Sequence, residues 1–165
     1  MKLRLPQTSD FEFYYDLKCE SSSIYWGGFE KPPDKEGLRI HFLRLMQGEI
    51  PKRKLYLLED QGRPVGYLQL TRNSETEIEF GYGVSERFRG CGYGSAIVGE
   101  AKRLVSEMEN TVDLIAYVRE DNYASRKCCE KNGMLQTDKY DIRHFALDRA
   151  DVKMDQYRWN KQMDL

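Results

Sequence analysis

The sequence is poor in the residues that build metal centres and disulfide frameworks. It has four cysteines, Cys19, Cys91, Cys128 and Cys129, and two histidines, His41 and His144. No two cysteines show the C-x-x-C spacing of a metal site, and neither histidine has a cysteine or another histidine within four residues. Four thiols at irregular spacing do not form the framework of a small secreted protein either. The sequence therefore predicts no metal site and favours a reducing, cytoplasmic environment.

Long hydrophobic runs and an excess of one charge are also missing. The longest apolar run is five residues, 114–118, and residues 1–6 lack the apolar core of a signal peptide. The 26 Lys and Arg residues are balanced by 27 Asp and Glu, so the composition lacks the positive charge typical of a protein that binds nucleic acid. A local basic patch is still compatible with this balance. We expect a single domain over residues 1–165, with neither a membrane nor a nucleic acid as partner.

What the sequence does have is a glycine-rich corner between a strand pattern and a helix pattern. Apolar side chains alternate at positions 78, 80, 82 and 84, and helical spacing follows at 97, 98, 101, 104, 105 and 108. Between them lie Gly90, Gly92 and Gly94, before a helix expected to start near residues 92–95. The first N–H groups of a helix lack partners within it, and glycines let a phosphate approach closely. With Arg87 and Arg89 beside it, the corner predicts an anion-binding site.

Two nucleotide-binding motifs do not fit this corner. The glycines lack the G-x-G-x-x-G spacing of a dinucleotide site because residue 95 is Ser, and no Gly-Lys-Ser/Thr sequence is present. The spacing therefore disfavours both a dinucleotide oxidoreductase and a nucleotide P-loop. Because a glycine-rich turn is also common as an ordinary loop, a ligand assignment needs a second motif.

That second motif gives the chain a family resemblance. Residues 89–94 read R-G-C-G-Y-G and resemble the R/Q-x-x-G-x-G/A signature of the GCN5-related N-acetyltransferases (GNAT), which lies between that family's fourth strand and a long helix. Residues 122–134 resemble the family's later N-x-x-S and E-K-x-G-F segment, with Met134 in place of Phe. Residues 3–5 and 8–10 are similar to the family's opening strand and helix start, whereas residues 20–50 match no pattern.

The resemblance implies an α/β (α+β) fold with a mixed, mostly antiparallel central sheet flanked by helices. The pattern predicts strands at residues 2–6, 54–60, 64–71, 76–84, 112–119, 134–143 and 151–162, and helices after residues 9–10, after 32–34, after the corner and at 122–132. Breaks are expected at residues 21–23 and 27–28, a turn at 73–74, and a helix stop at Gly133. In the family two parallel strands, here 76–84 and 112–119, splay apart at the acetyl-CoA site.

The resemblance also implies acetyl-CoA as co-substrate. Its pyrophosphate would contact the corner, which comprises Arg87, Arg89, Gly90, Cys91, Gly92, Tyr93, Gly94 and Ser95. Its pantetheine arm would lie between the splayed strands, near Tyr82 and Val84, where a backbone N–H is the family's usual oxyanion donor. Asn122 and Ser125 would bind the coenzyme from the following helix, and Asn122 could also be the N-cap of that helix.

Two side chains are candidates for proton transfer. Glu79 lies on the strand beside the expected acetyl group and could be the general base, directly or through water, or could simply be a solvated carboxylate. Many family members carry a Tyr as general acid immediately before the Glu-Lys of the second motif, and here that position is Cys129. A thiol can donate a proton, but a small residue on the inner face of a helix is also an ordinary core residue.

Two aromatic residues bear on the acceptor. Tyr25 and Trp26 are candidates either for an acceptor pocket or for packing beneath a loop. The expected activity is direct acetyl transfer, in a ternary complex, to an amino group of a small molecule, an amino sugar, or a peptide or protein, by a monomer or homodimer. The alternative, left open by the missing Tyr, is a non-catalytic acyl-CoA-binding or regulatory module.

Overall fold

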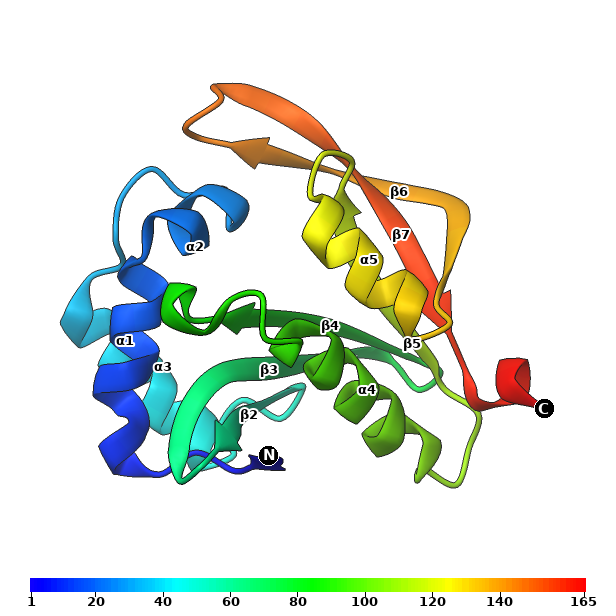
Figure 1. Ribbon diagram of the computed structural model, residues 1–165, viewed down its shortest axis with the longest axis horizontal. Helices are drawn as coiled ribbons and strands as arrows, with labels where there is room; N and C mark the ends of the chain where they lie inside the picture. The colour runs from blue at the N-terminus through cyan, green and yellow to red at the C-terminus, as the bar shows by residue number, and fades with distance from the viewer.

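A computed structural model describes residues 1–165, folded around one seven-stranded sheet with the order β1-β2-β3-β4-β5-β7-β6 (Figure 1). The strands are β1 (Lys2–Arg4), β2 (Arg53–Asp60), β3 (Arg63–Ser74), β4 (Glu77–Val84), β5 (Asp113–Arg119), β6 (Leu135–Phe145) and β7 (Ala150–Trp159). All neighbours are antiparallel except β4 and β5, which are parallel. The predicted mixed, mostly antiparallel sheet is confirmed.

Helices cover both faces of this sheet (Figure 1). One face carries α1 (Phe11–Cys19), α2 (Ser21–Trp26) and α3 (Lys35–Met46), and the other carries α4 (Tyr93–Ser106) and α5 (Tyr123–Lys131). Short 3-10 helices occur at Thr8–Asp10, Glu86–Phe88 and Lys161–Asp164. A cluster of 18 buried residues lies beneath α4 and α5, and a cluster of five joins α1, α3 and β2. None of the helices combines the length and the hydrophobicity that crossing a membrane needs.

The long helix α4 follows the apolar stripe predicted from the sequence. Ile97, Val98, Ala101 and Val105 are each at most 1% exposed. Burial of each of the three larger side chains contributes about 1.5–3 kcal/mol relative to leaving it in water. Met108 lies beyond the end of the helix at Ser106, because the last apolar position of the pattern falls in the following turn. The stripe fixes α4 on the sheet and so fixes the position of its N-terminus.

The predicted break at residues 21–23 is wrong, because these residues begin the short helix α2. Three serines are poor helix formers by themselves, but the structure supplies contacts from elsewhere in the chain. The carboxylate of Glu20 accepts hydrogen bonds from Ser85 Oγ at 2.7 Å and from the N–H of Glu86 at 3.0 Å. Ser22 Oγ donates to Glu86 Oε1 at 2.6 Å. These long-range bonds hold a helix that local propensity does not favour.

Two strand ends also differ from the prediction. β3 continues through the expected turn at residues 73–74, with a register shift between Arg72 and Ser74 against β4, and the chain reverses at residues 75–76. β7 ends at Trp159, short of residue 162, because the Asn160 side chain accepts from the N–H of Gln162 and caps a 3-10 helix. Neither change moves the elements that border the cleft described next.

Candidate active site

The parallel strands β4 and β5 separate partway along their length. Pairing is limited to Glu77 with Asp113, Ile78 with Leu114 and Glu79 with Ile115. β4 continues to Val84 and β5 to Arg119, so beyond the pairing their facing edges carry backbone groups without a partner on the other strand. A cleft of about 1240 Å³ opens here, bordered by both strands, the glycine corner, α5 and the α1–α3 side. The predicted splay is confirmed.

The glycine corner forms one end of this cleft. Gly90 and Gly92 have φ angles of 75° and 83°, a region that is strained for residues with a side chain. Gly92 is the N-cap of α4, and no side chain caps this helix, whereas the side chains of Asp34 and Asn122 cap α3 and α5. The first N–H groups of α4 are therefore left for another acceptor at the positive end of the helix dipole.

Charged side chains add to this end of the cleft, though not all of those predicted. Arg89 borders the cleft together with Gly90, Gly92, Tyr93, Gly94 and Ser95. Arg87 and the exposed Cys91 are not among the bordering residues. Lys127 and Lys131 of α5, which the sequence analysis did not single out, do border it. The positive charge at this end thus comes from one arginine and two lysines.

Tyr82 and Val84 of β4 border the cleft as expected for coenzyme contacts. The Tyr82 hydroxyl lies 3.3 Å from Ser125 Oγ, and it lies beside the Cys128 thiol. Burial, with the nearby Cys128, raises the pKa of Tyr82, so the phenol stays protonated at neutral pH. A Cβ on Gly94 would lie 3.1 Å from Cys128 Sγ, so this glycine allows α4 to approach α5 closely.

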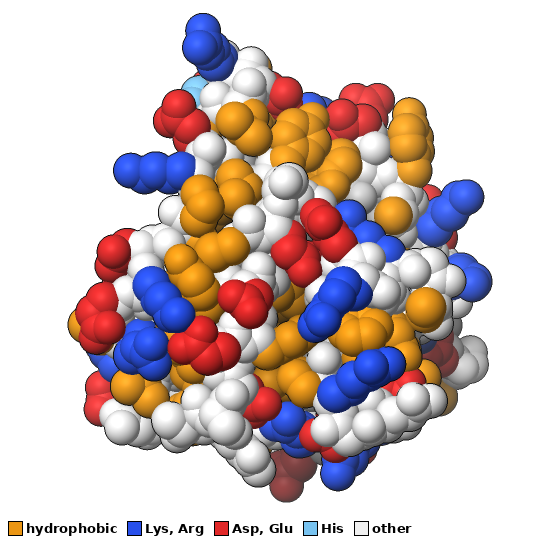
Figure 2. All heavy atoms as spheres, turned by 60° about the vertical axis from the view of Figure 1, so that its left-hand side comes forward, with side chains coloured by type: hydrophobic (Ala, Val, Ile, Leu, Met, Phe, Trp, Pro, Cys, Tyr) orange, Lys and Arg blue, Asp and Glu red, His pale blue; other side chains and the backbone are white.

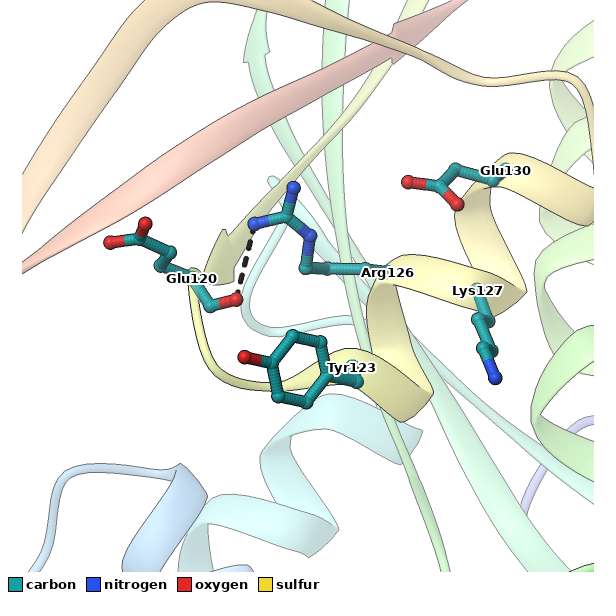
Figure 3. Close-up of a pocket in the computed structure, with 5 residues that line it drawn as sticks. All are labelled: Glu120, Tyr123, Arg126, Lys127 and Glu130. Carbon is teal, nitrogen blue, oxygen red and sulfur yellow. Dashed lines mark hydrogen bonds between the residues drawn. The ribbon is translucent and has the colours of Figure 1, made fainter.

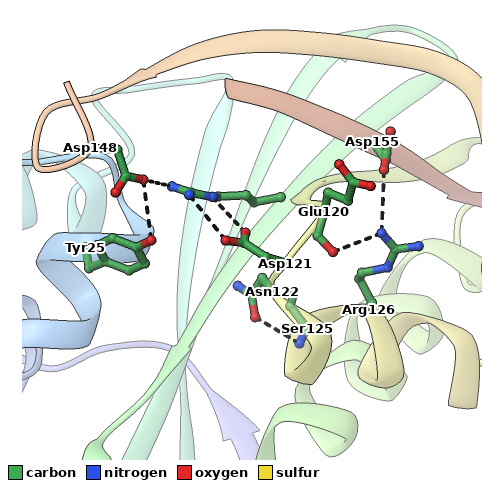
Figure 4. Close-up of polar contacts among 9 residues, drawn as sticks. Tyr25, Glu120, Asp121, Asn122, Ser125, Arg126, Asp148 and Asp155 are labelled. Atoms are coloured by element: carbon green, nitrogen blue, oxygen red, sulfur yellow. Dashed lines mark hydrogen bonds and ion pairs between the residues drawn. The ribbon is translucent and has the colours of Figure 1, made fainter. Parts of the chain in front are cut away.

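Asn122 and Ser125 lie at the start of α5 and also border the cleft. Asn122 Oδ1 accepts from the backbone N–H of Ser125 at 3.3 Å (Figure 4). The expected N-cap is therefore present, and it holds both side chains at the cleft.

Cys129 lies on the other side of α5 from the cleft. Its side chain is fully buried in the 18-residue core cluster, and burial raises the pKa of its thiol to about 12. Cys128, one residue earlier, is half-buried and borders the cleft. The thiol that borders the cleft is therefore that of Cys128, whereas the family motif points to Cys129.

Glu79 forms the last pair before the strands splay. Its Oε1 accepts from Arg143 Nη2 at 3.0 Å, whereas its Oε2 has only a 3.5 Å contact with Asn73 Nδ2. Arg143 comes from β6, pairs also with Asp141, and lies 5.2 Å from the centre of the Tyr117 ring. Arg143 borders the cleft, whereas Glu79, its ion-pair partner, does not. Glu79 is thus linked to the cleft through a cation that the sequence did not predict.

The predicted acceptor residues of α2 join the β6–β7 hairpin. Tyr25 packs edge-on against Trp26 at 4.8 Å between ring centres, and its hydroxyl lies 3.4 Å from Asp148 Oδ2. Arg119 of β5 pairs with Asp121 and Asp148, and its guanidinium lies 5.3 Å and 5.8 Å from the ring centres of Tyr25 and Trp26. Figure 4 shows Tyr25, Asp121 and Asp148 in this group. We call these five residues the Arg119 clasp. Within it Trp26 and Arg119 border the cleft, whereas Tyr25 acts as their support.

A cluster that the sequence analysis missed lies on the α1–α3 side of the cleft. We call Lys18 of α1, His41 of α3 and Arg53 of β2 the basic cluster; all three border the cleft. Lys18 Nζ donates to Tyr67 Oη at 2.8 Å and lies 4.3 Å and 5.3 Å from the ring centres of Tyr67 and Tyr14. The sequence offered one signal for this cluster, the i, i+4 spacing of Tyr14 and Lys18 on one helix. His41 and Arg53 come from distant segments, so no linear pattern joins them to Lys18.

A second, shallow hollow of about 350 Å³ lies on the outer face of α5 (Figure 3). It is bordered by Glu120, Tyr123, Arg126, Lys127 and Glu130. Arg126 donates to the carbonyl oxygen of Glu120 at 3.1 Å. Its two carboxylates and two cations balance each other, so the hollow offers no anion site comparable to the glycine corner.

The residues of the main cleft fit acetyl-CoA. An uncapped helix N-terminus with Arg89 suits a pyrophosphate, and two unpaired strand edges suit the peptide-like pantetheine arm. Gly81 leaves room for a ligand beside the unpaired edge of β4, because a Cβ at this position would meet nothing within 4 Å. Fold and cleft together define a transferase that uses an acyl-CoA.

Comparison with known proteins supports this class. Residues 1–135 match the sequence profile of the acetyltransferase (GNAT) domain. The chain belongs to this family, whose members transfer an acetyl group from acetyl-CoA to an amino group, so it is an N-acetyltransferase with acetyl-CoA as co-substrate. The match favours the enzyme over the non-catalytic module. None of the curated protein sequences compared matches the chain.

Solved structures share the fold over nearly the whole chain. The spermidine N-acetyltransferase from Vibrio cholerae, in complex with CoA and spermine, aligns with a TM-score of 0.85 at 14% identity over 98% of this chain and 96% of its own. A phosphinothricin acetyltransferase from Sinorhizobium meliloti with acetyl-CoA gives 0.74 at 15% identity, over 96% and 87%. A ribosomal-protein alpha-N-acetyltransferase with CoA gives 0.78 at 17% identity, over 95% and 92%. At this identity the likeness establishes the fold.

Proposed function

We propose that the cleft between β4 and β5 holds acetyl-CoA with its pyrophosphate at the glycine corner, and that a primary amine reaches it from the α1–α3 side. The observation that carries this proposal is the splay after Glu79, combined with an uncapped α4 N-terminus at the same cleft. Arg89 and the N–H groups of residues 90–95 would bind the pyrophosphate. Arg87 and Cys91 would contribute through the backbone or the outer rim, since neither borders the cleft.

The strand edges and the start of α5 would position the rest of the coenzyme. The free N–H and C=O groups of β4, near Tyr82 and Val84, would pair with pantetheine amides, and one N–H there would stabilise the oxyanion. Asn122 and Ser125 would contact the coenzyme from α5, where the N-cap already fixes them. Bound acetyl-CoA supplies the acetyl group as a thioester.

Glu79 is our candidate for the general base. Its Oε1 is engaged by Arg143, but its Oε2 has only one long contact, so it could accept the amine proton through a water molecule. The C–N bond forms as the C–S bond breaks, and the proton lost by the amine ends on the thiol of CoA. The acceptor amine would lie above Gly81, where the floor of the cleft is open.

For the leaving sulfur we assign the supporting donor to Tyr82 and a packing role to Cys129. The Tyr82 phenol is protonated and borders the cleft, so it can donate a hydrogen bond to a departing thiolate. Cys129 could donate only if α5 turned, because its thiol is fully buried in the core.

The acceptor is an amine, and the protein's neighbours in fold act on amines of different kinds. The structural neighbours include enzymes for a polyamine, for phosphinothricin and for a protein N-terminus, so the fold admits small and peptide amines alike. Trp26, supported by Tyr25, would border the acceptor. Four free cysteines suit a reducing compartment, and we propose a cytoplasmic enzyme acting as a monomer or homodimer.

The experiment that tests this function combines binding with turnover. Calorimetry should detect acetyl-CoA binding, and release of CoA should become amine-dependent with at least one member of a panel of amines. A crystal of the complex should place the pyrophosphate within hydrogen-bond reach of at least two N–H groups of residues 90–95. Phosphates found elsewhere, or no binding of acetyl-CoA, would refute the assignment.

A further inference from the structure

The acceptor side of the cleft carries positive charge that acetyl transfer itself does not require. Eight Lys and Arg side chains border the whole cleft, but only two acidic ones, Glu30 and Asp34, and both of these are exposed. The whole chain has a net charge of −1, so the excess is local. Arg119 and Arg143 are already paired with carboxylates. The lysine and the arginine of the basic cluster, in contrast, have no carboxylate partner.

Lys18 and Arg53 form no ion pair anywhere in the structure. Lys18 is half-buried and donates to the Tyr67 hydroxyl. His41 is surrounded by like charges: burial lowers its pKa, and Arg53, Arg44 and Lys18 lower it further. The Tyr67 hydroxyl and the faces of two tyrosine rings hold the Lys18 ammonium, but no carboxylate neutralises its charge, so the site can receive an anion.

This anion is not part of the coenzyme's pyrophosphate. In the register of the sheet Arg53 pairs with Thr71, and Thr71 pairs with Glu79, so Arg53 lies in the row of Glu79. That row is five residues, or about 17 Å, along β4 from Val84, whereas Tyr67, which accepts from Lys18, pairs with Gly83, one residue before Val84. Lys18 is therefore separated from the glycine corner by the face of the sheet, not by the row. The basic cluster also belongs to the α1–α3 face, whereas the corner opens at α4 on the opposite face.

The same region is a poor place for a polyamine. An organic cation binds best over the faces of aromatic rings, and Tyr14 and Tyr67 provide such faces in this part of the cleft. Lys18 Nζ already lies 4.3 Å and 5.3 Å from their ring centres. A second cation here would meet like charge from Lys18 and Arg53. Figure 2 shows the side of the molecule that carries α1–α3, where hydrophobic surface runs between charged side chains.

We propose that the acceptor is a small primary amine that also bears a carboxylate, and that Lys18, together with Arg53 and His41, binds this carboxylate. The inference rests on the proposed function, because it assigns the substrate class of the same cleft. The carboxylate would lie against the basic cluster while the amine lies above Gly81, near Glu79. Tyr67 would hold Lys18 in place through its hydroxyl.

Matched acceptors test this inference. We would compare amino acids and ω-amino acids of increasing length with their own amides, which keep the amine and lose the anionic charge, and with spermidine. The wild-type protein should acetylate at least one acid with a kcat/KM at least tenfold above that of its amide and of spermidine. Lys18→Met should raise KM for that acid about 10- to 100-fold, the loss expected for one charge-assisted hydrogen bond. The amides should change less than twofold.

The matched control is Lys54→Met, which removes an exposed lysine next to Arg53 on β2 that does not border the cleft. It should behave as wild type with every acceptor, and both variants should bind acetyl-CoA normally. An NMR titration of His41 adds a readout that is independent of turnover. With CoA bound, the preferred acid should raise the pKa of His41, and Lys18→Met should raise it without any acid.

Three results would overturn the inference. The first is a kcat/KM for spermidine or an amide that equals that of every acid. The second is an equal rise in KM for acids and amides in Lys18→Met, and the third is an unchanged pKa of His41 with every acid although acetyl-CoA binds. These differ from failure of the proposed function, which would appear as loss of acetyl-CoA binding itself and would remove the basis of this inference too.

Discussion

The two ends of the cleft are built in different ways. The coenzyme end is formed largely by the backbone of one continuous segment, residues 80–95, with the start of α5 beside it. The acceptor end is formed by side chains from α1, α2, α3, β2 and β6. Binding through backbone groups needs a particular conformation, which glycines and a helix start encode locally. Binding through side chains needs only that distant segments meet, so its residues leave no linear pattern.

The largest expected effect concerns Gly81, where the two ends meet. Gly81→Val should fold normally, because a Cβ at this position meets nothing within 4 Å, yet it should lower turnover at least about 100-fold by displacing the reacting groups. Thermal melting and single-turnover rates measure the two effects. Thr71→Val, which changes the same sheet face outside the cleft, is the control and should keep its activity. Unchanged turnover in Gly81→Val would show that the acetyl group binds elsewhere.

Glu79→Gln tests whether the acceptor end also supplies the base. We expect turnover with a primary amine to fall about 100-fold at neutral pH and less at high pH, where the amine loses its proton without help. Glu77→Gln, two residues earlier on the same face, should have little effect. A pH profile that is lowered in parallel at every pH would assign Glu79 to holding Arg143 in place instead.

Gly92→Val tests the coenzyme end through the backbone. No atom obstructs the new side chain, so the effect should come from its φ of 83°, which a β-branched residue adopts at a cost of about 1–3 kcal/mol. Moving the corner should weaken acetyl-CoA binding about tenfold, measured by calorimetry. Gly48→Val has the same kind of strain, with a φ of 71° and open space, but lies outside the cleft. Equal affinity in both variants would argue against backbone binding at the corner.

Cys129→Ala should affect the core more than the chemistry. Loss of a buried thiol should lower the free energy of unfolding by about 1–2 kcal/mol and leave turnover per folded molecule nearly unchanged. Denaturant unfolding and single-turnover kinetics separate the two quantities. Cys91→Ala, at an exposed thiol, should change neither. A large loss of rate at unchanged stability would make Cys129 the proton donor after all.

Arg119→Met should have the smallest effect, confined to the acceptor end. The Arg119 side chain is only 11% exposed, but its partners Asp121 and Asp148 are 50% and 31% exposed, so water can solvate both carboxylates when the guanidinium is removed. Loss of the Arg119 clasp should therefore raise the acceptor KM a few-fold and leave acetyl-CoA binding unchanged. Arg103→Met, which breaks two exposed ion pairs on α4, serves as the control. Equal effects of Arg119→Met on both substrates would mean that the clasp supports the whole cleft.

The sequence by itself determined the sheet, the helix after the corner and the family. Alternation at residues 78–84 and the apolar stripe of α4 express the periods of a strand and a helix, which depend on neighbours in the chain. The glycines at 90 and 92 are needed wherever the chain turns with positive φ. The corner was therefore predictable from a dozen residues.

Only the tertiary structure decided which side chains share the cleft. It buried Cys129 and turned Cys128 toward the cleft, although the two are adjacent in the sequence. It formed α2 from serines through the distant Glu86, and it brought Lys18 and Arg53 to one wall from segments 35 residues apart. Such contacts depend on how helices pack on the sheet, and packing is a property of the whole core that no local pattern records.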